Sequence, residues 1–222
     1  MCSLEKILSS EKDEDKASWQ ASYMRLQFPF FGIPKPQLDK LIKTFLQDNP
    51  IGDEAQLMNF MRNCWNKEQR EFQYVALTAG TKYKKLWTPD FLPFLKELIV
   101  VKSWWDTVDY LAANLVGLLI KQYPELITEM DRWVKDPNMW VRRSALLFQL
   151  KWKQETDQKR LFSYCAALQH EKEFFIRKAI GWALREYSKA APKEVQAFLE
   201  ANKDTLSPLS YKEGMKRLQR KG

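Results

Sequence analysis

Residues 102–109 read Lys-Ser-Trp-Trp-Asp-Thr-Val-Asp, and they open an apolar helical segment that continues to residue 116. Trp105 and Asp109 are four residues apart, so a helix places them on one face, one turn from each other. An indole face and a carboxylate both favour positive charge, the first through its quadrupole and the second through Coulomb attraction. This stretch therefore predicts a helix that presents a site for a cation.

The aromatic start of this segment recurs along the chain. Trp105, Trp140 and Phe175 are spaced by 35 residues each time, and each opens a helix of similar length. Phe72, 33 residues before Trp105, matches the same position in an earlier unit. A period in the mid-thirties with two helices per unit is typical of α-solenoids of the HEAT or armadillo type. We therefore expect an all-α solenoid with a concave basic face, formed as one domain by residues 1–222.

Apolar residues at helical spacing predict the other elements, and no stretch shows the two-residue period of a strand. Prolines and a glycine end any helix in the aromatic segment 28–36, so we expect a loop pinned to the core there. The expected helices are 4–26 with a junction at 11–15, 37–47, 53–66, 68–77, 90–100, 103–121, 124–136, 138–151, 156–169, 172–189, 192–201 and 210–220.

The net charge of +8 lies in the second half of the chain. Residues 1–111 hold 15 basic and 15 acidic side chains, whereas residues 112–222 hold 21 and 13. A one-sided basic surface attracts polyanions, of which nucleic acid is the commonest. Basic pairs recur at matched repeat positions, Arg142/Arg143 and Arg177/Lys178, as expected for a groove along a phosphate backbone. The alternative is that these arginines cover core edges with their stems.

Several functional classes are disfavoured by what the sequence lacks. The only histidine is His170, and the three cysteines are far apart without a CxxC pair. Triads that use histidine, zinc knuckles and nucleotide-binding loops have no matching motif, and the cysteines fit a reducing compartment. No signal peptide is visible and no apolar run approaches 18 residues, so we expect a cytoplasmic, nucleoid-associated protein with no membrane segment. These observations alone favour a binding module over an enzyme.

Four segments with unusual runs change that expectation. They are residues 23–25 (Tyr-Met-Arg) with 28–33, residues 103–109, residues 140–145 and residues 174–187. In these segments the chain resembles the DNA alkylation repair family, the AlkD-like DNA glycosylases built from HEAT-like repeats. The resemblance extends over residues 23–215. It implies hydrolysis of the N-glycosidic bond of N3- and N7-alkylated purines, such as 3-methyladenine and 7-methylguanine, in duplex DNA.

The resemblance also implies site residues. The tryptophan, aspartate and arginine of the family's active site fall on Trp105, Asp109 and Arg143, and a second cleft tryptophan falls on Trp182. This sequence does not depart from the family at these four positions, whereas members without glycosylase activity tend to differ there. Further contacts to DNA or to the lesion are expected from Arg142, Arg177, Lys178, Arg185, Tyr23 and Arg25.

The implied chemistry agrees with these residue types. A 3-alkyladenine or 7-alkylguanine is already cationic, so its departure needs no general acid. Asp109 is expected to stabilise the oxocarbenium-like sugar and to orient or deprotonate the attacking water. Trp105 and Trp182 are expected to hold the cationic nucleotide by cation–π contact. Arg143 is expected to clamp a flanking phosphate, and no metal or other cofactor is required.

Several alternatives remain open. Asp109 could be a structural acid bonded to Arg143. Trp104 faces about 100° away from Trp105 on a helix and is expected in the core rather than in the cleft. The chain could also bind damaged or branched DNA without cutting it, or act as a protein-interaction solenoid. The interpretation that unites the most observations is a monomeric, monofunctional glycosylase on duplex DNA with alkylated bases.

Overall fold

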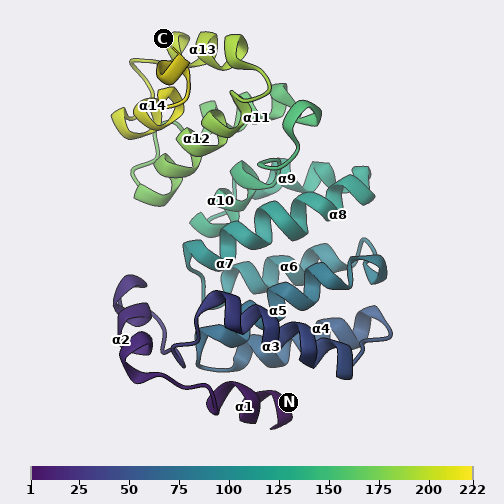
Figure 1. Ribbon diagram of the computed structural model, residues 1–222. Coiled ribbons are helices and arrows are strands. Elements are labelled where there is room, and N and C mark those ends of the chain that lie inside the picture. Colours follow the sequence, from purple (N-terminus) through teal and green to yellow (C-terminus); the bar gives the residue numbers. More distant parts are fainter. Residues whose placement is uncertain (1, 222) are drawn as a thin grey trace. The chain divides into compact units, whose positions relative to one another are not determined.

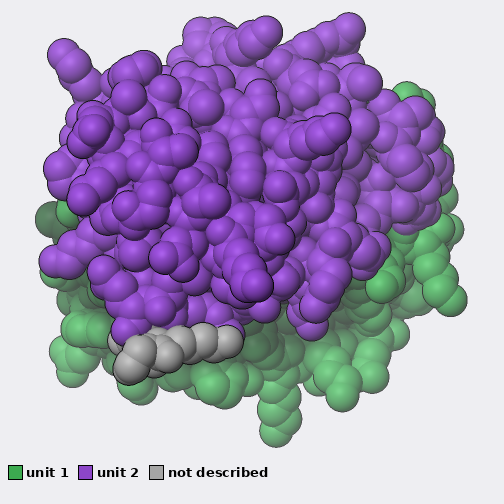
Figure 2. Space-filling view, turned by 90° about the horizontal axis from the view of Figure 1, so that it is seen from above, with its two compact units in different colours: residues 1–94 green, residues 95–222 purple. Residues whose placement is uncertain are grey.

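The structure, a computed structural model, describes residues 2–221 and the side chains of residues 3–219. Every regular element in this range is a helix (Figure 1), which confirms the predicted all-α class. The chain divides into two compact units, residues 1–94 and residues 95–222 (Figure 2). The single domain and the concave basic face stay predictions.

The first unit contains five complete helices, one short 3₁₀ turn and the beginning of a sixth helix that crosses into the second unit. These elements are α1 (Cys2–Ser9), α2 (Glu14–Tyr23), α3 (Lys35–Asp48), α4 (Glu54–Asn66), α5 (Arg70–Lys82), η1 (Lys84–Leu86) and α6 (Phe91–Val100). Helices α4 and α5 pack against each other as a pair. The helix expected over 4–26 is interrupted at the acidic junction, where Asp13 caps α2 by accepting a hydrogen bond from Lys16 N.

The aromatic loop between α2 and α3 is pinned to the core, as the sequence predicts. Phe31 and Ile33 are buried, and the backbone amides of residues 31–33 all donate to Oε1 of Glu71, at 2.9, 2.9 and 3.3 Å. Gly32 has φ +90°, and a Cβ atom there would lie 2.1 Å from the carbonyl oxygen of Asp13. Glycine therefore lets this loop pass close to α2.

The second unit continues with helices α7 to α14 and short turns between them. These elements are α7 (Trp105–Tyr110), η2 (Leu111–Val116), α8 (Gly117–Gln122), η3 (Pro124–Leu126), α9 (Ile127–Trp133), α10 (Met139–Leu147), η4 (Lys153–Glu155), α11 (Gln158–Ala167), α12 (Phe174–Tyr187), α13 (Pro192–Ala201), α14 (Pro208–Met215) and η5 (Leu218–Lys221). Asn138, Asp157 and Ser207 cap α10, α11 and α14 by accepting backbone N–H bonds, as residues of these types do at helix starts.

The helix expected over 103–121 is present but is not uniform. Its middle turn, η2, is π-helical, and it begins two residues after Asp109. Five of the six residues of η2 are apolar and buried, and the sixth is Asn114, so their spacing alone gives no sign of the wider turn. Single π turns inserted in α-helices are frequent at functional sites, because they change the direction of side chains on either side.

Helices α12 and α14 lie side by side at the end of the second unit (Figure 1). Gly181 of α12 makes this close approach possible, since a Cβ atom there would lie 2.5 Å from Cβ of Glu213. The hydroxyl of Ser210 donates to the carbonyl oxygen of Arg177 at 2.9 Å and fixes the two helices further. As a result, the side chain of Glu213 is buried against α12.

Candidate functional site

Two of the three aromatic residues of the predicted repeat, Trp140 and Phe175, meet in one cluster. Their ring centroids are 4.9 Å apart, and the ring of Trp104 lies 6.0 Å from the first and 5.2 Å from the second. The residue that joins them at the beginning of α7 is thus Trp104, 36 residues before Trp140, and not Trp105 as the 35-residue spacing predicted. Trp104 packs in this cluster and not in the pocket of Trp105, but it is partly exposed and not in the core as predicted.

Trp105 lines a pocket of about 310 Å³ beside this cluster. That volume is near the lower end of the range for small-ligand sites, about 300–1,000 Å³. The pocket brings together five residues predicted from the sequence and three that were not predicted. Its lining consists of Trp105, Arg143, Phe174, Phe175, Lys178, Trp182, Arg185 and Glu213. An aromatic wall with a few charged groups suits a flat cationic or polar ligand.

Asp109 forms a bidentate ion pair with Arg143, which lines this pocket. Nε of Arg143 donates to Oδ1 of Asp109 at 2.7 Å, and Nη2 donates to Oδ2 at 2.8 Å. The remaining nitrogen, Nη1, donates to the carbonyl oxygen of Phe175. The side chain of Arg143 is 5% exposed, and that of Asp109 is 14% exposed. A parallel pair of this kind fixes the orientation of a carboxylate.

This geometry bears on the predicted roles of both residues. All three nitrogens of the Arg143 guanidinium bind protein atoms, which favours a role in holding Asp109 over the predicted phosphate clamp. Asp109 does not itself line the pocket, but it lies one helical turn after Trp105, which does. A carboxylate has about four lone-pair sites, and Arg143 occupies two. Two lone-pair sites are not used by Arg143, and 14% of the Asp109 side chain is exposed.

The charge state of Asp109 follows from burial and from its partner. Burial raises the pKa of Asp109, and the hydrogen bonds and positive charge of Arg143 oppose that rise. The nearby carboxylate of Asp106 adds a smaller upward shift of the pKa. Asp109 is therefore a more basic carboxylate than a solvated aspartate. A carboxylate of that kind can accept a proton from an attacking water.

Glu213 is the charged residue of the pocket that the sequence did not indicate. Its side chain is 3% exposed, and Oε2 accepts from Nζ of Lys178 at 2.6 Å and of Lys216 at 2.7 Å. Oε1 accepts from Arg185. Burial, together with the charges of Lys216, Arg185 and Arg143, lowers the pKa of Lys178. The spacing of Glu213 and Lys216, three residues apart, was the only sequence signal for this cluster.

Arg142 and Arg177 lie outside the pocket lining. Arg142 Nη1 donates to the carbonyl oxygens of Asp136 and Pro137 at 2.7 and 2.8 Å, and its Nε lies 2.9 Å from Oε1 of Glu171. Arg177 Nε donates to the carbonyl oxygen of Glu171 at 2.8 Å. Both arginines thus tie the loops before α10 and α12 to their helices. Their predicted contacts with DNA stay predictions.

Tyr23 and Arg25 belong to the first unit. Tyr23 is exposed, and its ring stacks on that of Trp19 at 5.7 Å with an interplanar angle of 11°. The same two rings line a pocket of about 300 Å³ beside α2. Arg25 is exposed and has φ +55°, a left-handed conformation. A joint action of these residues with the Trp105 pocket of the second unit stays a prediction.

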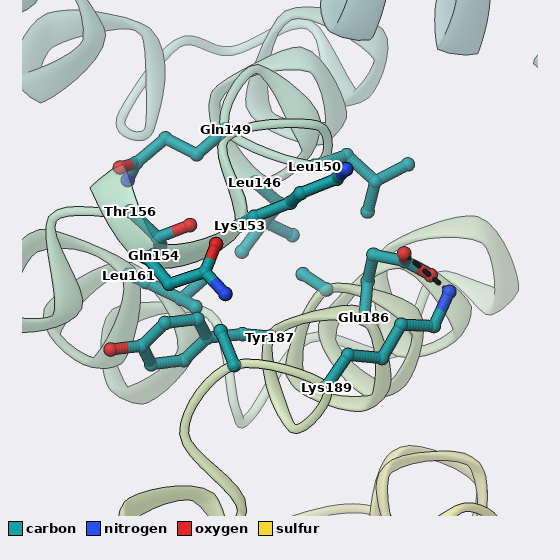
Figure 3. Close-up of a pocket in the computed structure, with 12 residues that line it drawn as sticks. Leu146, Gln149, Leu150, Lys153, Gln154, Thr156, Leu161, Glu186, Tyr187 and Lys189 are labelled. Carbon is teal, nitrogen blue, oxygen red and sulfur yellow. Dashed lines mark hydrogen bonds and ion pairs between the residues drawn. The ribbon is translucent and has the colours of Figure 1, made fainter.

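A different pocket of the second unit, of about 240 Å³, is shown in Figure 3. The ion pair between Glu186 and Lys189 lies at one edge, and the ring of Tyr187 lies near the other. The residues that line it come from the end of α10, the following turn, α11 and α12. None of the site residues predicted from the sequence lines this pocket, whereas five of them line the Trp105 pocket.

The described residues contain neither a metal-binding cluster nor a membrane-spanning helix. Among the side chains of residues 3–219, no group of three His, Cys, Asp or Glu residues is placed to hold a metal ion. No helix within residues 2–221 has the length and apolar character needed to cross a membrane. Cys64 and Cys165 are buried thiols, and burial raises the pKa of Cys64 to about 12, while Cys2 lies outside the described side chains. The absence of a cofactor from the reaction stays a prediction.

Comparison with known proteins identifies the family. Residues 4–218 match the family described as DNA alkylation repair enzyme. A solved structure described as a predicted DNA alkylation repair enzyme from Enterococcus faecalis is 32% identical, with a TM-score of 0.87 over 94% of this chain and 97% of that chain. The matched part of the chain and the sequence identity are each sufficient to establish homology over nearly the whole chain.

Two structures from Streptococcus mutans share the fold at 21% identity. AlkD2 has a TM-score of 0.63 over 81% of this chain and 89% of its own, and smu.31 has 0.62 over 81% and 96%. No curated protein sequence matches this chain significantly. These relatives confirm the predicted helical-repeat fold. The chain belongs to the DNA alkylation repair enzyme family, as the resemblance of its four segments implied.

Proposed function

We propose that this member of the family is a monofunctional DNA glycosylase that hydrolyses the N-glycosidic bond of cationic N3- and N7-alkylated purines in duplex DNA. Membership of the family supports a role in alkylation repair, and the site supports the finer assignment. The observation that carries it is the pairing of a two-tryptophan pocket with a carboxylate of fixed orientation. We assign Asp109 and Trp105 as catalytic residues and Arg143 as a positioning residue.

The pocket suits a positively charged base. Trp105 and Trp182 both line it, and an indole face attracts a cation by about 0.5–2 kcal/mol, depending on how far water is excluded. The wall continues through Phe174 and Phe175, which add apolar surface. The two indole faces can therefore hold a methylated purine cation, while the cationic side chains of Lys178 and Arg185 in the same lining suit the anionic DNA backbone.

The reaction itself needs little acid–base help. The bond between the sugar C1′ and the purine nitrogen breaks, and its electron pair moves to the purine, which becomes neutral. The sugar is left as an oxocarbenium-like cation. A fixed carboxylate stabilises that developing charge without having to reorganise. Water then forms a bond to C1′, and its proton passes to Asp109 or to solvent, which leaves an abasic site.

Release of free base is the direct test. Duplex DNA that carries one 7-methylguanine is incubated with the protein, and the free base is separated by chromatography. We expect release well above the spontaneous rate measured without protein, and the same release in the presence of EDTA. DNA binding without release above the spontaneous rate contradicts the proposal, as does loss of release in EDTA that is restored by a metal ion.

A second function, binding of damaged or branched DNA without cleavage, also has an observation in its favour. Arg143 occupies two lone-pair sites of Asp109, which is what a purely structural acid would show. The base-release assay separates the two functions, because a binding protein would retain affinity for the duplex and release nothing. We favour catalysis because a structural pair alone does not require two tryptophans in the adjoining pocket.

The finer properties of the protein follow from this assignment. We propose that it acts as a monomer on duplex DNA with alkylated bases, in the cytoplasm with the nucleoid, and that the excised base and an abasic site are its products. Light scattering with and without a short duplex tests the first point. A mass of two chains on one lesion would contradict it.

A further inference from the structure

Glu213 is a buried carboxylate that gathers three cations at the edge of the Trp105 pocket. Lys178 and Arg185 come from α12, and Lys216 follows α14. All three bind Glu213, whose side chain is only 3% exposed, whereas their own side chains are 38%, 31% and 47% exposed. The carboxylate is therefore buried, whereas the three cationic side chains are partly exposed to solvent.

The charges of this cluster do not cancel. Three positive groups surround one negative group, so two positive charges remain. Each lysine has three N–H donors and arginine has five, and each cation uses a single nitrogen on Glu213. Donors are thus left over, and they sit on exposed side chains beside the pocket that Lys178 and Arg185 line. An anion at this place would bind the remaining donors and relieve the repulsion among the cations.

The fold brings Glu213 to this position at some cost. A carboxylate that leaves water loses hydration, and only well-placed partners compensate. Gly181 allows α14 to approach α12 closely enough for Glu213 to enter, because a Cβ atom there would lie 2.5 Å from Cβ of Glu213. A simple contact between two helices does not need a buried acid. The function of this acid is therefore to hold the three cationic side chains in fixed positions.

We propose that Lys178, Arg185 and Lys216, held in place by Glu213, form a binding site for a phosphodiester group of a DNA strand at the edge of the Trp105 pocket. Glu213 is the positioning residue, and Lys216 is a DNA contact that the sequence did not indicate. This inference rests on the proposed function to the extent that both place DNA at this pocket. It explains why a positive site needs a negative centre, since one carboxylate aligns three flexible side chains.

The proposal predicts a change in DNA affinity opposite to the change that net charge alone would give. Glu213→Gln raises the net charge by one unit, so a purely structural role predicts equal or tighter binding of DNA by the folded protein. If Glu213 positions the cations, its loss frees them to spread into solvent. Binding then weakens although the protein is more positive.

The experiment measures the affinity for an undamaged duplex at several salt concentrations, so it does not depend on base release. The matched control is Glu200→Gln, because Glu200 is exposed and accepts a hydrogen bond from Tyr211 of α14 outside the pocket. For Glu213→Gln we expect at least about a threefold loss of affinity and a smaller slope of log affinity against log salt, by about 0.9 for each phosphate group that the protein no longer binds. Binding by Glu213→Gln that equals or exceeds that of Glu200→Gln, with the same slope, overturns the proposal.

A second pair of variants covers the case in which Glu213→Gln does not fold. Lys216→Met and Lys212→Met each remove one positive charge from the same end of α14. We expect the salt slope to fall by about 0.9 for Lys216→Met and to change less for Lys212→Met. Equal slopes for these two variants overturn the proposal.

The two proposals can fail independently. If the wild-type protein releases no base but the variants change binding as described, the phosphate site stands and the glycosylase assignment falls. If base is released but the two variants bind like their controls, the glycosylase assignment stands and the phosphate site falls. A duplex with a neutral methylphosphonate in place of single phosphates around the lesion identifies the contacted group. The affinity of the wild-type protein should fall at one such position, and Lys216→Met should show no further loss there.

Discussion

Glu71 in the first unit and Asp109 in the second are carboxylates largely removed from solvent, and they are held in different ways. Glu71 in the first unit binds neutral partners, the backbone amides of residues 31–33, through one oxygen. Asp109 in the second unit binds a cation, Arg143, through both oxygens. Burial raises the pKa of both carboxyl groups, but only Asp109 has a charged partner that opposes the rise.

The difference separates an acid that organises a loop from an acid that serves a site. Glu71 is 1% exposed, and its amide partners belong to the loop that it fixes. Asp109 keeps 14% of its side chain exposed and lies one turn from a tryptophan in a pocket. Burial and a raised pKa are therefore shared by both residues. The neighbouring surface, rather than the carboxyl group itself, indicates which of them acts on a substrate.

The largest expected effect is that of Arg143→Ala, which leaves Asp109 as an unpaired buried charge. Breaking a buried pair by removal of one partner costs about 3–5 kcal/mol of stability. We therefore expect a large loss in the free energy of unfolding and loss of base release, measured by thermal melting and by the release assay. Arg132→Ala is the control, because the exposed Arg132 pairs with Glu129 three residues away, and an exposed pair of that kind contributes about 0–1 kcal/mol. Equal losses for the two variants would contradict the assignment.

Glu71→Gln is expected to have the next largest effect, and only on stability. Hydrogen bonds to a charged group contribute about 1.5–3 kcal/mol net, so their weakening should lower the free energy of unfolding by about 1–3 kcal/mol. Base release per folded molecule should stay at the wild-type value. The check is chemical denaturation followed by the release assay on the folded fraction. A specific loss of release would mean that the two acids are not as different as described.

Trp105→Ala should have a smaller effect, on binding of the lesion and on rate together. Removal of a cation–π interaction costs about 0.5–2 kcal/mol, which corresponds to a factor of roughly 2–30. Trp105→Phe should recover part of this loss because it keeps an aromatic face. Trp104→Phe is the matched control, since Trp104 packs against Trp140 and Phe175 outside the pocket lining. Single-turnover rates at several enzyme concentrations separate binding from rate, and equal effects for both tryptophans would contradict the assignment.

The smallest effect concerns pH. The pKa of Asp109 is raised, so base release should begin to fall at a higher pH than the ordinary aspartate pKa of about 3.9 would give. The effect on stability has the opposite sign. Because the pKa of Asp109 is higher in the folded state, its protonated form stabilises the fold at a pH below the pKa of the unfolded state, and this contribution is lost as the pH rises through the pKa of the folded state. The measurement is a pH–rate profile corrected for spontaneous base loss. An acidic limb that is unchanged in Asp109→Asn would contradict the role.

The sequence predicted most of the fold for identifiable reasons. Apolar spacing and the acidic junction located most helices, and the 35-residue repeat brought Trp140 and Phe175 into contact. The π turn η2 was not predictable, because five of its six residues are apolar and the same residues would suit an α-helix. The pinned loop was predicted from its aromatics, but its anchor Glu71 lies about 40 residues away and carries no local signal.

The candidate site was predicted less completely. The resemblance to the family supplied Trp105, Arg143 and Trp182, which the structure brings into one pocket. It did not supply Glu213, because a single acid in a basic segment looks like an ordinary surface residue until α14 packs on α12. Residue type and spacing do not distinguish Arg142, which binds backbone carbonyls, from Arg143, which binds Asp109, and only the resemblance to the family separated them. These distinctions depend on tertiary contacts between distant helices.

The central claim is that the Asp109 carboxylate contributes to the reaction and not only to the fold. Single-turnover base release by Asp109→Asn, expressed per folded molecule and measured beside Glu71→Gln, tests it most directly. The account predicts that both variants lose stability, that Glu71→Gln keeps the wild-type rate, and that Asp109→Asn is slower by roughly tenfold to a thousandfold, or about 1.4–4 kcal/mol of barrier. A folded Asp109→Asn variant that releases base at the wild-type rate would contradict it.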